Sequence, residues 1–133
     1  MIRVIKPEEI FQYWEELSTS DITRLHPIKE LSWQFGKVAS GELSAVGFFE
    51  DEVMKGLIIF ETQRVPVNGS VELKAVTRQI YGPHNTRRYA KEFADWLHGQ
   101  GYKKFGGITM RNGDAMARLI KGRVVYSYVE REV

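Results

Sequence analysis

The spacing of apolar residues changes period along the chain, and this change most constrains the fold. Three β-like runs follow one another at residues 43–50, 53–62 and 70–79. An amphipathic helix comes next, with an apolar stripe formed by Tyr89, Phe93, Trp96 and Leu97. A further strand is predicted at Lys104–Met110. A helical crossover places the strand after it parallel to the strand before it. The pattern therefore predicts an α/β fold in which an antiparallel meander continues into a parallel crossover, with helices on both faces.

The other predicted elements are shorter. They are a first strand at Ile2–Ile5, a helix from Pro7 to about Leu17, a second helix at roughly Ile28–Phe35, a turn at Arg64–Gly69, a short helix after Asn112-Gly113-Asp114, and a final strand at Val124–Val129.

The composition excludes several kinds of chemistry. The chain has 133 residues, of which 43% are hydrophobic, as expected of one folded domain. It has no cysteine, which excludes disulfides, thiolate nucleophiles and cysteine-based zinc sites. No apolar run approaches the roughly 20 residues of a membrane helix, and the charged start does not resemble a secretory signal. We expect a cytoplasmic protein with no membrane partner and, because histidines and acids do not cluster, no metal site.

Charge is distributed unevenly along the chain. Residues 1–66 hold 7 Lys and Arg against 11 Asp and Glu, whereas residues 67–133 hold 12 against 6. The basic second half fits a phosphate-bearing ligand, a nucleic acid or an acidic partner, and it equally fits ordinary solvated faces. Aromatic and basic residues do not interleave as they do in a strand that stacks bases, which disfavours nucleic acid.

One strand–loop–helix unit could carry chemistry. The strand from Glu72 runs into a loop containing Gly82, and Asn85 or Thr86 can cap the helix that follows. Free backbone N–H groups at such a helix start favour phosphate, and Arg87 in the first turn adds charge. The unit is therefore either a pyrophosphate cradle or an ordinary β–α connection.

The same unit resembles a known family. Residues 72–86 are similar, without gaps, to the strand and coenzyme-A loop of the GNAT (acetyl-CoA N-acyltransferase) family, with Ala75-Val76 at the strand end and Gly82 in the loop. Asn112 and Lys121 are similar to the family's next helix, and Gly56 to its third strand. The resemblance implies a single GNAT-like domain over residues 1–133, with an acceptor side at 1–42 and a coenzyme-A core at 43–133.

The resemblance also implies a mechanism. An amine would attack the thioester of acetyl-CoA directly, with Glu72 as the candidate base and Tyr126, or alternatively Tyr128, as the acid that protonates the leaving thiolate. A backbone N–H near Val76 would polarise the thioester oxygen. The implied coenzyme-A residues are Val76, Thr77, Gly82, His84, Asn85, Thr86, Arg87 and Asn112.

A second function stays open beside this one. Tyr81 replaces the loop arginine, His84 and Thr86 replace small residues, and Leu119 replaces the acidic tyrosine of many members. These departures favour a catalytically inactive GNAT-fold protein, loosely similar to phage virion or assembly proteins, with protein partners in a virion. Pairing of the last strand across a homo-oligomer is open under either function.

Overall fold

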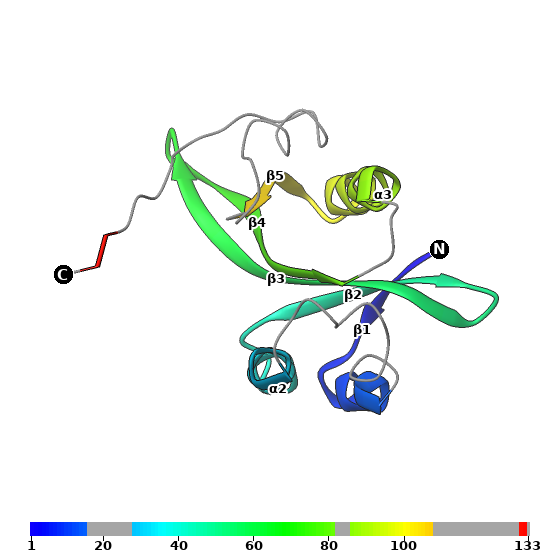
Figure 1. Cartoon of the computed structure of the whole chain (residues 1–133). Coiled ribbons are helices and arrows are strands. Elements are labelled where there is room, and N and C mark those ends of the chain that lie inside the picture. The colour runs from blue at the N-terminus through cyan, green and yellow to red at the C-terminus, as the bar shows by residue number, and fades with distance from the viewer. Residues whose placement is uncertain (16–27, 82–85, 108–130, 133) are drawn as a thin grey trace.

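The computed structural model describes residues 1–15, 28–81, 86–107 and 131–132 (Figure 1). In chain order the elements are β1 (Ile2–Ile5), the 3-10 helix η1 (Pro7–Tyr13), α2 (Ile28–Ala39), β2 (Ser44–Glu50), β3 (Val53–Val67), β4 (Ser70–Tyr81), α3 (Thr86–Gly99) and β5 (Tyr102–Gly107).

The strands form a mixed sheet in the order β1-β2-β3-β4-β5. The pairs from β1 to β4 are antiparallel, and β4 pairs with β5 in parallel. Helix α3 is the crossover between these two parallel strands. The predicted α/β class, an antiparallel meander followed by a parallel crossover, is confirmed.

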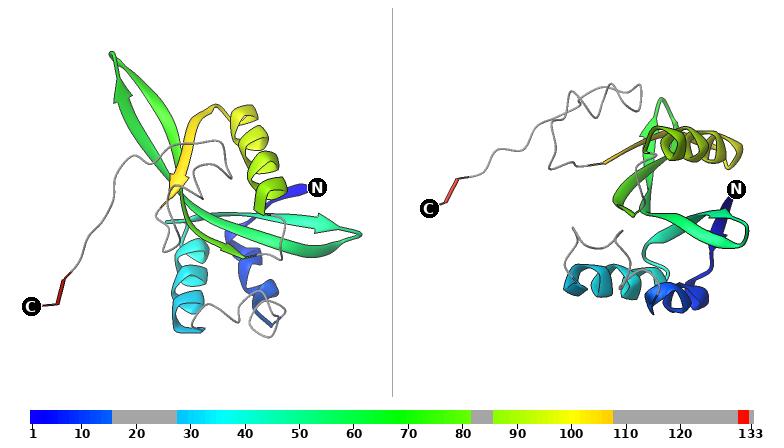
Figure 2. Two further views of the ribbon diagram at one scale, coloured as in Figure 1. Left: turned by 45° about the horizontal axis from the view of Figure 1, so that its top comes forward. Right: turned by 45° about the vertical axis from the view of Figure 1, so that its right-hand side comes forward.

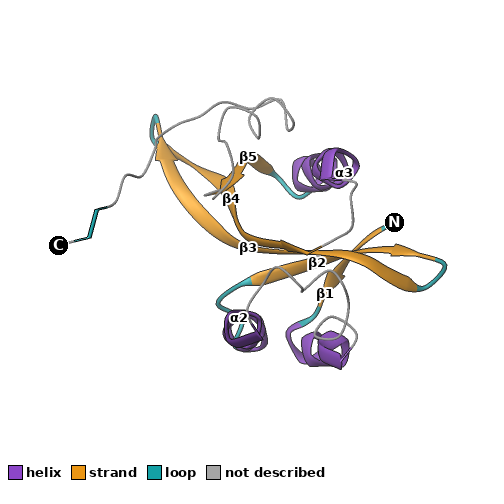
Figure 3. Ribbon diagram, in the orientation of Figure 1, coloured by secondary structure: helices purple, strands orange, loops and turns teal. Residues whose placement is uncertain are grey.

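Helices cover both faces of the sheet (Figures 1 and 3). Strand β3 shows why, because its run Leu57-Ile58-Ile59-Phe60 is apolar at every position and fully buried. Leu57 and Ile59 pack into a cluster with residues of η1 and α2, whereas Ile58 and Phe60 pack with residues of α3. A strand buried on both faces gives such a continuous apolar run rather than an alternating one.

Aromatic rings form the core beneath α3. Phe93 is completely buried, and its ring centroid lies 5.3 Å from that of Phe60 and 5.6 Å from that of Phe105. Trp96 stacks on Phe93 at 6.2 Å. These contacts join the crossover helix to the central strand and to β5.

The predicted turn at Arg64–Gly69 is wrong. Strand β3 continues to Val67, and only Asn68 and Gly69 form the turn, with φ of 47° and 82°. Pro66 suggested a break, since proline cannot donate a ladder hydrogen bond. It is tolerated because, after Phe60, β3 pairs with β4 alone among the described strands, so Pro66 lies on a local edge.

Helices form where they were predicted, but the first differs in kind and both differ in their bounds. The chain from Pro7 forms a 3-10 helix to Tyr13, entered through reciprocal bonds between Lys6 and Glu9, and Leu17 lies outside the described residues. Helix α2 runs four residues past Phe35, to Ala39.

The bounds of the last described strand also differ from the prediction. Strand β5 begins two residues earlier than predicted, at Tyr102. Residues 108–110, the short helix after Asn112 and the strand at Val124–Val129 lie outside the described residues. In the described ranges no helix is long and apolar enough to cross a membrane.

The aromatic core beneath α3 predicts a large effect of truncation. Phe93→Ala should lower the free energy of unfolding by about 3–5 kcal/mol, because it opens a cavity among rings that cannot close over it. Urea denaturation followed by circular dichroism measures this. Phe11→Ala is the matched control, since Phe11 is 52% exposed, and its loss should be about 1 kcal/mol. Equal losses for the two variants would contradict this account of the core.

Candidate functional site

Strand β4 contains a β-bulge in the middle of the sheet. Ile59 pairs with Gln79 and the next residue, Phe60, pairs with Thr77, so Arg78 is an extra residue on β4. Bulges bend a strand and change the direction of side chains, and they are frequent next to active sites. The bulge makes this part of β4 a candidate for binding or catalysis.

Strands β4 and β5 approach most closely just before the bulge. The Thr77 hydroxyl donates a 2.9 Å hydrogen bond to the carbonyl of Gly106. A Cβ atom on Gly107 would lie 2.2 Å from Thr77 Oγ1 and 3.0 Å from its carbonyl oxygen, so only glycine fits without movement. A Cβ on the preceding Gly106 would meet no described atom within 4 Å. The described structure thus has no room for a side chain at Gly107 but has room for one at Gly106.

The carboxyl ends of β4 and β5 lie at one edge, together with the start of α3 (Figure 2). Past Thr77, residues 78–81 of β4 pair only with β3 among the described strands. The first N–H groups of a helix have no partner within the helix, and the helix dipole adds partial positive charge there. Ligands of parallel sheets commonly bind at this edge. The arrangement suits an anionic group.

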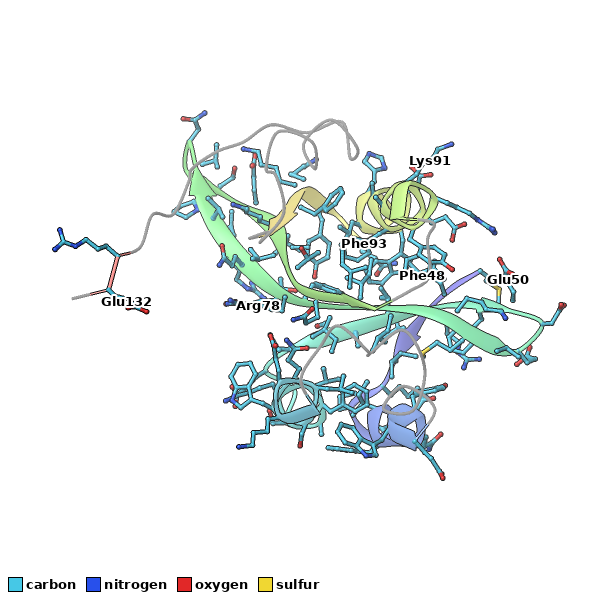
Figure 4. All side chains as sticks on the ribbon, in the orientation of Figure 1. Phe48, Glu50, Arg78, Lys91, Phe93 and Glu132 are labelled. Atoms are coloured by element: carbon cyan, nitrogen blue, oxygen red, sulfur yellow. The ribbon has the colours of Figure 1, made fainter. Side chains whose placement is uncertain are left out.

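The basic residue Arg88 in the first turn of α3 is already paired. Its guanidinium contacts Glu92 at 3.0 Å and Glu50 at 3.1 Å. Glu50 projects from the end of β2 toward the side of the sheet that carries α3 (Figure 4). The hydrogen bond to Glu92, followed by the charges of Glu92 and Glu50, raises the pKa of Arg88. Arg88 therefore joins α3 to the β2–β3 hairpin, and its charge is shared with two carboxylates.

Tyr89 fixes the same turn of α3 to the sheet. It is buried, and its ring stacks on Phe48 with 4.4 Å between centroids. Its hydroxyl donates a long 3.5 Å bond to the carbonyl of Lys55. Burial, and then the nearby charge of Glu50, raises the pKa of Tyr89. This residue has a structural role in holding the helix start in place.

An open polar groove lies on the opposite face of the sheet, between the sheet and α2. It is lined by Trp33, Lys37, Glu42, Leu43, Glu61 and Arg78. Arg78 forms an ion pair with Glu61 across the β3–β4 pair. Lys37 contacts Glu42 at 2.8 Å, and this hydrogen bond lowers the pKa of Glu42. Trp33 is 59% exposed, and the Lys37 ammonium lies over its ring at 5.5 Å from the centroid.

The structure brings some of the predicted site residues together. Val76 pairs with Gly106 and Thr77 with Gly107, at the closing point of β4 and β5. The chain of α3 begins at Thr86 and continues through Arg87. Gly82, His84, Asn85, Asn112 and Tyr126 lie outside the described residues.

Glu72 lies apart from this edge. It pairs with Val65 near the β3–β4 turn, five residues before Thr77, which is roughly 17 Å along an extended strand. It lines a small depression together with Val65, Leu73, Lys74 and Lys104.

The sequence analysis missed the residues of the α2-side groove. Glu61 belonged to an alternating run, and Arg78 to a strand without a visible break. The bulge that exposes Arg78 depends on the register between β3 and β4, which no local pattern reports. Among the described residues, no group of three or more acidic or histidine side chains could hold a metal.

The fold is shared with solved acetyltransferases. A ribosomal-protein-alanine N-acetyltransferase from Brucella melitensis biovar Abortus 2308 superposes over 100% of this chain and 99% of its own, with a TM-score of 0.65 and 17% identity. The aminoglycoside N-acetyltransferase AAC(6')-Iy, in complex with a coenzyme-A bisubstrate analogue, superposes over 100% of this chain and 97% of its own, with a TM-score of 0.65 and 15% identity. This chain has the GNAT fold.

The GNAT fold is not limited to proteins named as acetyltransferases. A transcriptional regulator from Bacillus halodurans C-125 superposes over 100% of this chain and 99% of its own, with a TM-score of 0.61 and 9% identity. No family model and no curated protein sequence matches the chain.

The tight approach of β5 to Thr77 predicts opposite effects at two neighbouring glycines. Gly107→Ala should destabilise the protein by about 1–3 kcal/mol, because the new methyl overlaps Thr77. Gly106→Ala should leave the stability unchanged or raise it by up to about 1 kcal/mol, since the methyl enters open space and the unfolded chain loses freedom. Thermal unfolding measures both. A larger loss at Gly106 than at Gly107 would show that the described β4–β5 register is incorrect.

Proposed function

We propose that the protein is an acetyl-CoA-dependent N-acetyltransferase that transfers the acetyl group directly to an amine. The observation that carries this proposal is the sheet edge that holds the carboxyl ends of β4 and β5 together with the start of α3, on a fold shared over its full length with N-acetyltransferases. One of these, AAC(6')-Iy, has been solved with coenzyme A itself.

The proposed substrate lies along the carboxyl ends of β4 and β5. Val76 and Thr77 are the last residues of β4 that pair with β5, and they would contact the acyl arm where the described pairing ends. The pyrophosphate would bind at the start of α3. There Thr86 and Arg87 begin the helix, and N–H groups without helical partners favour an anion. From outside the described residues, Gly82, His84, Asn85 and Asn112 remain proposed contacts by resemblance.

The reaction needs a base that takes the amine proton and an acid that protonates the leaving thiolate. The acetyl thioester supplies an activated carbonyl carbon, which the amine nitrogen attacks. A backbone N–H near Val76 is the proposed donor to the carbonyl oxygen. By resemblance, Glu72 is a candidate base and Tyr126 a candidate acid. Direct transfer requires no cysteine nucleophile, which agrees with a chain that has none.

The inactive alternative has support of its own. Arg88, one of the described cations in the first turn of α3, is held by Glu50 and Glu92. The loop before the helix carries Tyr81 and His84 in place of the family's usual residues. Under this alternative the protein is a catalytically inactive phage virion or assembly component that binds protein partners.

Coenzyme-A binding separates the two functions. Acetyl-CoA should raise the melting temperature of the wild-type protein, because a ligand that binds only the folded state stabilises it by about 2.7 kcal/mol at one hundred times its dissociation constant. Differential scanning fluorimetry measures this. No shift at millimolar acetyl-CoA would reject the enzyme, and recovery of the protein within purified phage particles would support the assembly protein.

A pair of charge variants on α3 tests where the phosphates bind. Arg87→Ala should weaken coenzyme-A binding about tenfold or more, as expected for loss of a charge-assisted hydrogen bond worth roughly 1.5–3 kcal/mol. Isothermal titration calorimetry measures the affinity. Lys91→Ala is the matched control, because Lys91 is exposed one turn further along α3 (Figure 4) and its loss changes the net charge equally. Equal weakening by both variants would indicate a general charge effect instead of a site at the helix start.

A further inference from the structure

We infer that Glu61, on β3, is the carboxylate that receives the acceptor's amine and takes its proton, and that the α2-side groove is where the acceptor enters. This inference rests on the proposed acetyltransfer. It identifies a catalytic residue and an acceptor class for that reaction. The observation that supports this inference is that Glu61, Val76 and Gly106 lie side by side on three neighbouring strands.

The register places Glu61 in one row with the proposed acyl site. Glu61 pairs with Val76 across the antiparallel ladder, and Val76 pairs with Gly106 across the parallel one. Directly opposed residues project from the same face of a sheet, with Cβ atoms about 4.5–5.5 Å apart. The Glu61 side chain therefore lies beside the residue whose backbone is proposed to bind the thioester oxygen.

Among the residues that the structure describes, this row is open on the face that carries the groove. A Cβ on Gly106 would meet no described atom, whereas a Cβ on Gly107, which points to the other face, would overlap Thr77. Glu61 is partly accessible, with 33% of its side chain exposed. An amine coming from the α2 side can therefore reach Val76 past a carboxylate.

Glu72 has a less favourable position for the same role. It projects from the same face, but it lies four residues before Val76, roughly 13 Å along the strand. A general base must lie within hydrogen-bond reach of the proton that it removes, or reach it through one water. Glu61 pairs directly with Val76 and therefore lies nearer to a proton released there than Glu72 does.

The other groove residues indicate the acceptor's chemistry. Arg78, at the bulge, forms the ion pair that orients Glu61 toward the β4 side. An incoming ammonium group can replace the guanidinium as the partner of Glu61. The exposed ring of Trp33 offers apolar surface beside it. The structure therefore favours a primary amine on an apolar body, either a small molecule or the first residue of a peptide.

The reaction step balances without any other reactant. The bound ammonium group first releases one proton to solvent. The neutral amine nitrogen then attacks the thioester carbon, a C–N bond forms and the C–S bond breaks. Glu61 accepts the proton from nitrogen, and the thiolate leaves. Return of that proton to the thiolate restores Glu61 and gives the free thiol and the amide.

Carboxylate-to-amide variants test this assignment. Glu61→Gln should lower kcat/KM for acetyl transfer to phenethylamine by about 10²–10⁴-fold, as expected for loss of a general base. It should leave the coenzyme-A dissociation constant unchanged. Thiol release and calorimetry are the measurements. Glu52→Gln, at the exposed β2–β3 turn, is the control and should match wild type.

The outcomes separate this inference from the proposed function. Full activity of Glu61→Gln, or a greater loss in Glu72→Gln, would overturn the assignment while leaving the acetyltransferase intact. Absence of coenzyme-A binding in the wild type would reject the proposed function itself. A leucine-first tripeptide amide tested beside phenethylamine identifies which source of amine is preferred.

Amine binding can be measured separately if the wild-type protein binds coenzyme A but transfers acetyl to neither amine. The Trp33 indole N–H resonance, assigned with Trp33→Phe, should shift when either amine is added to the coenzyme-A complex. It should not shift in Glu61→Gln. No shift in the wild type would overturn the acceptor groove.

Discussion

The parallel pairing of β4 with β5 is the contact on which the rest of the molecule depends. It closes at Thr77, where a hydroxyl bonds to the Gly106 carbonyl and the absence of a side chain on Gly107 allows the two backbones to meet. A parallel pair requires a crossover, and α3 is that crossover. The position of α3 then brings the N-terminus of a helix to the carboxyl ends of both strands. The candidate anion site follows from this single pairing.

Because β3 is buried on both faces, each face of the sheet holds a different part of the proposed site. On one face, Ile58 and Phe60 hold α3, and with it the proposed phosphate end of the site. On the other face, Leu57 and Ile59 hold η1 and α2, and α2 forms one wall of the groove. Ligands proposed to approach from opposite faces would meet at β4, where the bulge at Arg78 interrupts the ladder. The inferred role of Glu61 follows from its place on the strand between the two faces.

Local patterns predicted the types of the described elements because burial imposes a period on each of them. They predicted the bounds less well. Pro66 suggested a break, yet β3 continues because that stretch has a neighbour on one side only. Helix α2 extends past Phe35 because Val38 is buried in the same cluster, and this tertiary contact is not visible in the residues before it. The resemblance at residues 72–86 identified the strand and helix of the candidate site, and it directed attention to Glu72.

By itself the sequence determined the fold class, the order of the elements and the strand–loop–helix unit at which a phosphate-bearing substrate is proposed to bind. These features depend on residues close together in the chain, whose spacing records which side is buried. Only the tertiary structure decided the rest. It showed that Arg88 is paired with Glu50, that Gly107 is required by Thr77, and that Glu61 stands opposite Val76. Each of these contacts joins different elements, and a shift of one residue in strand register would change which side chains meet.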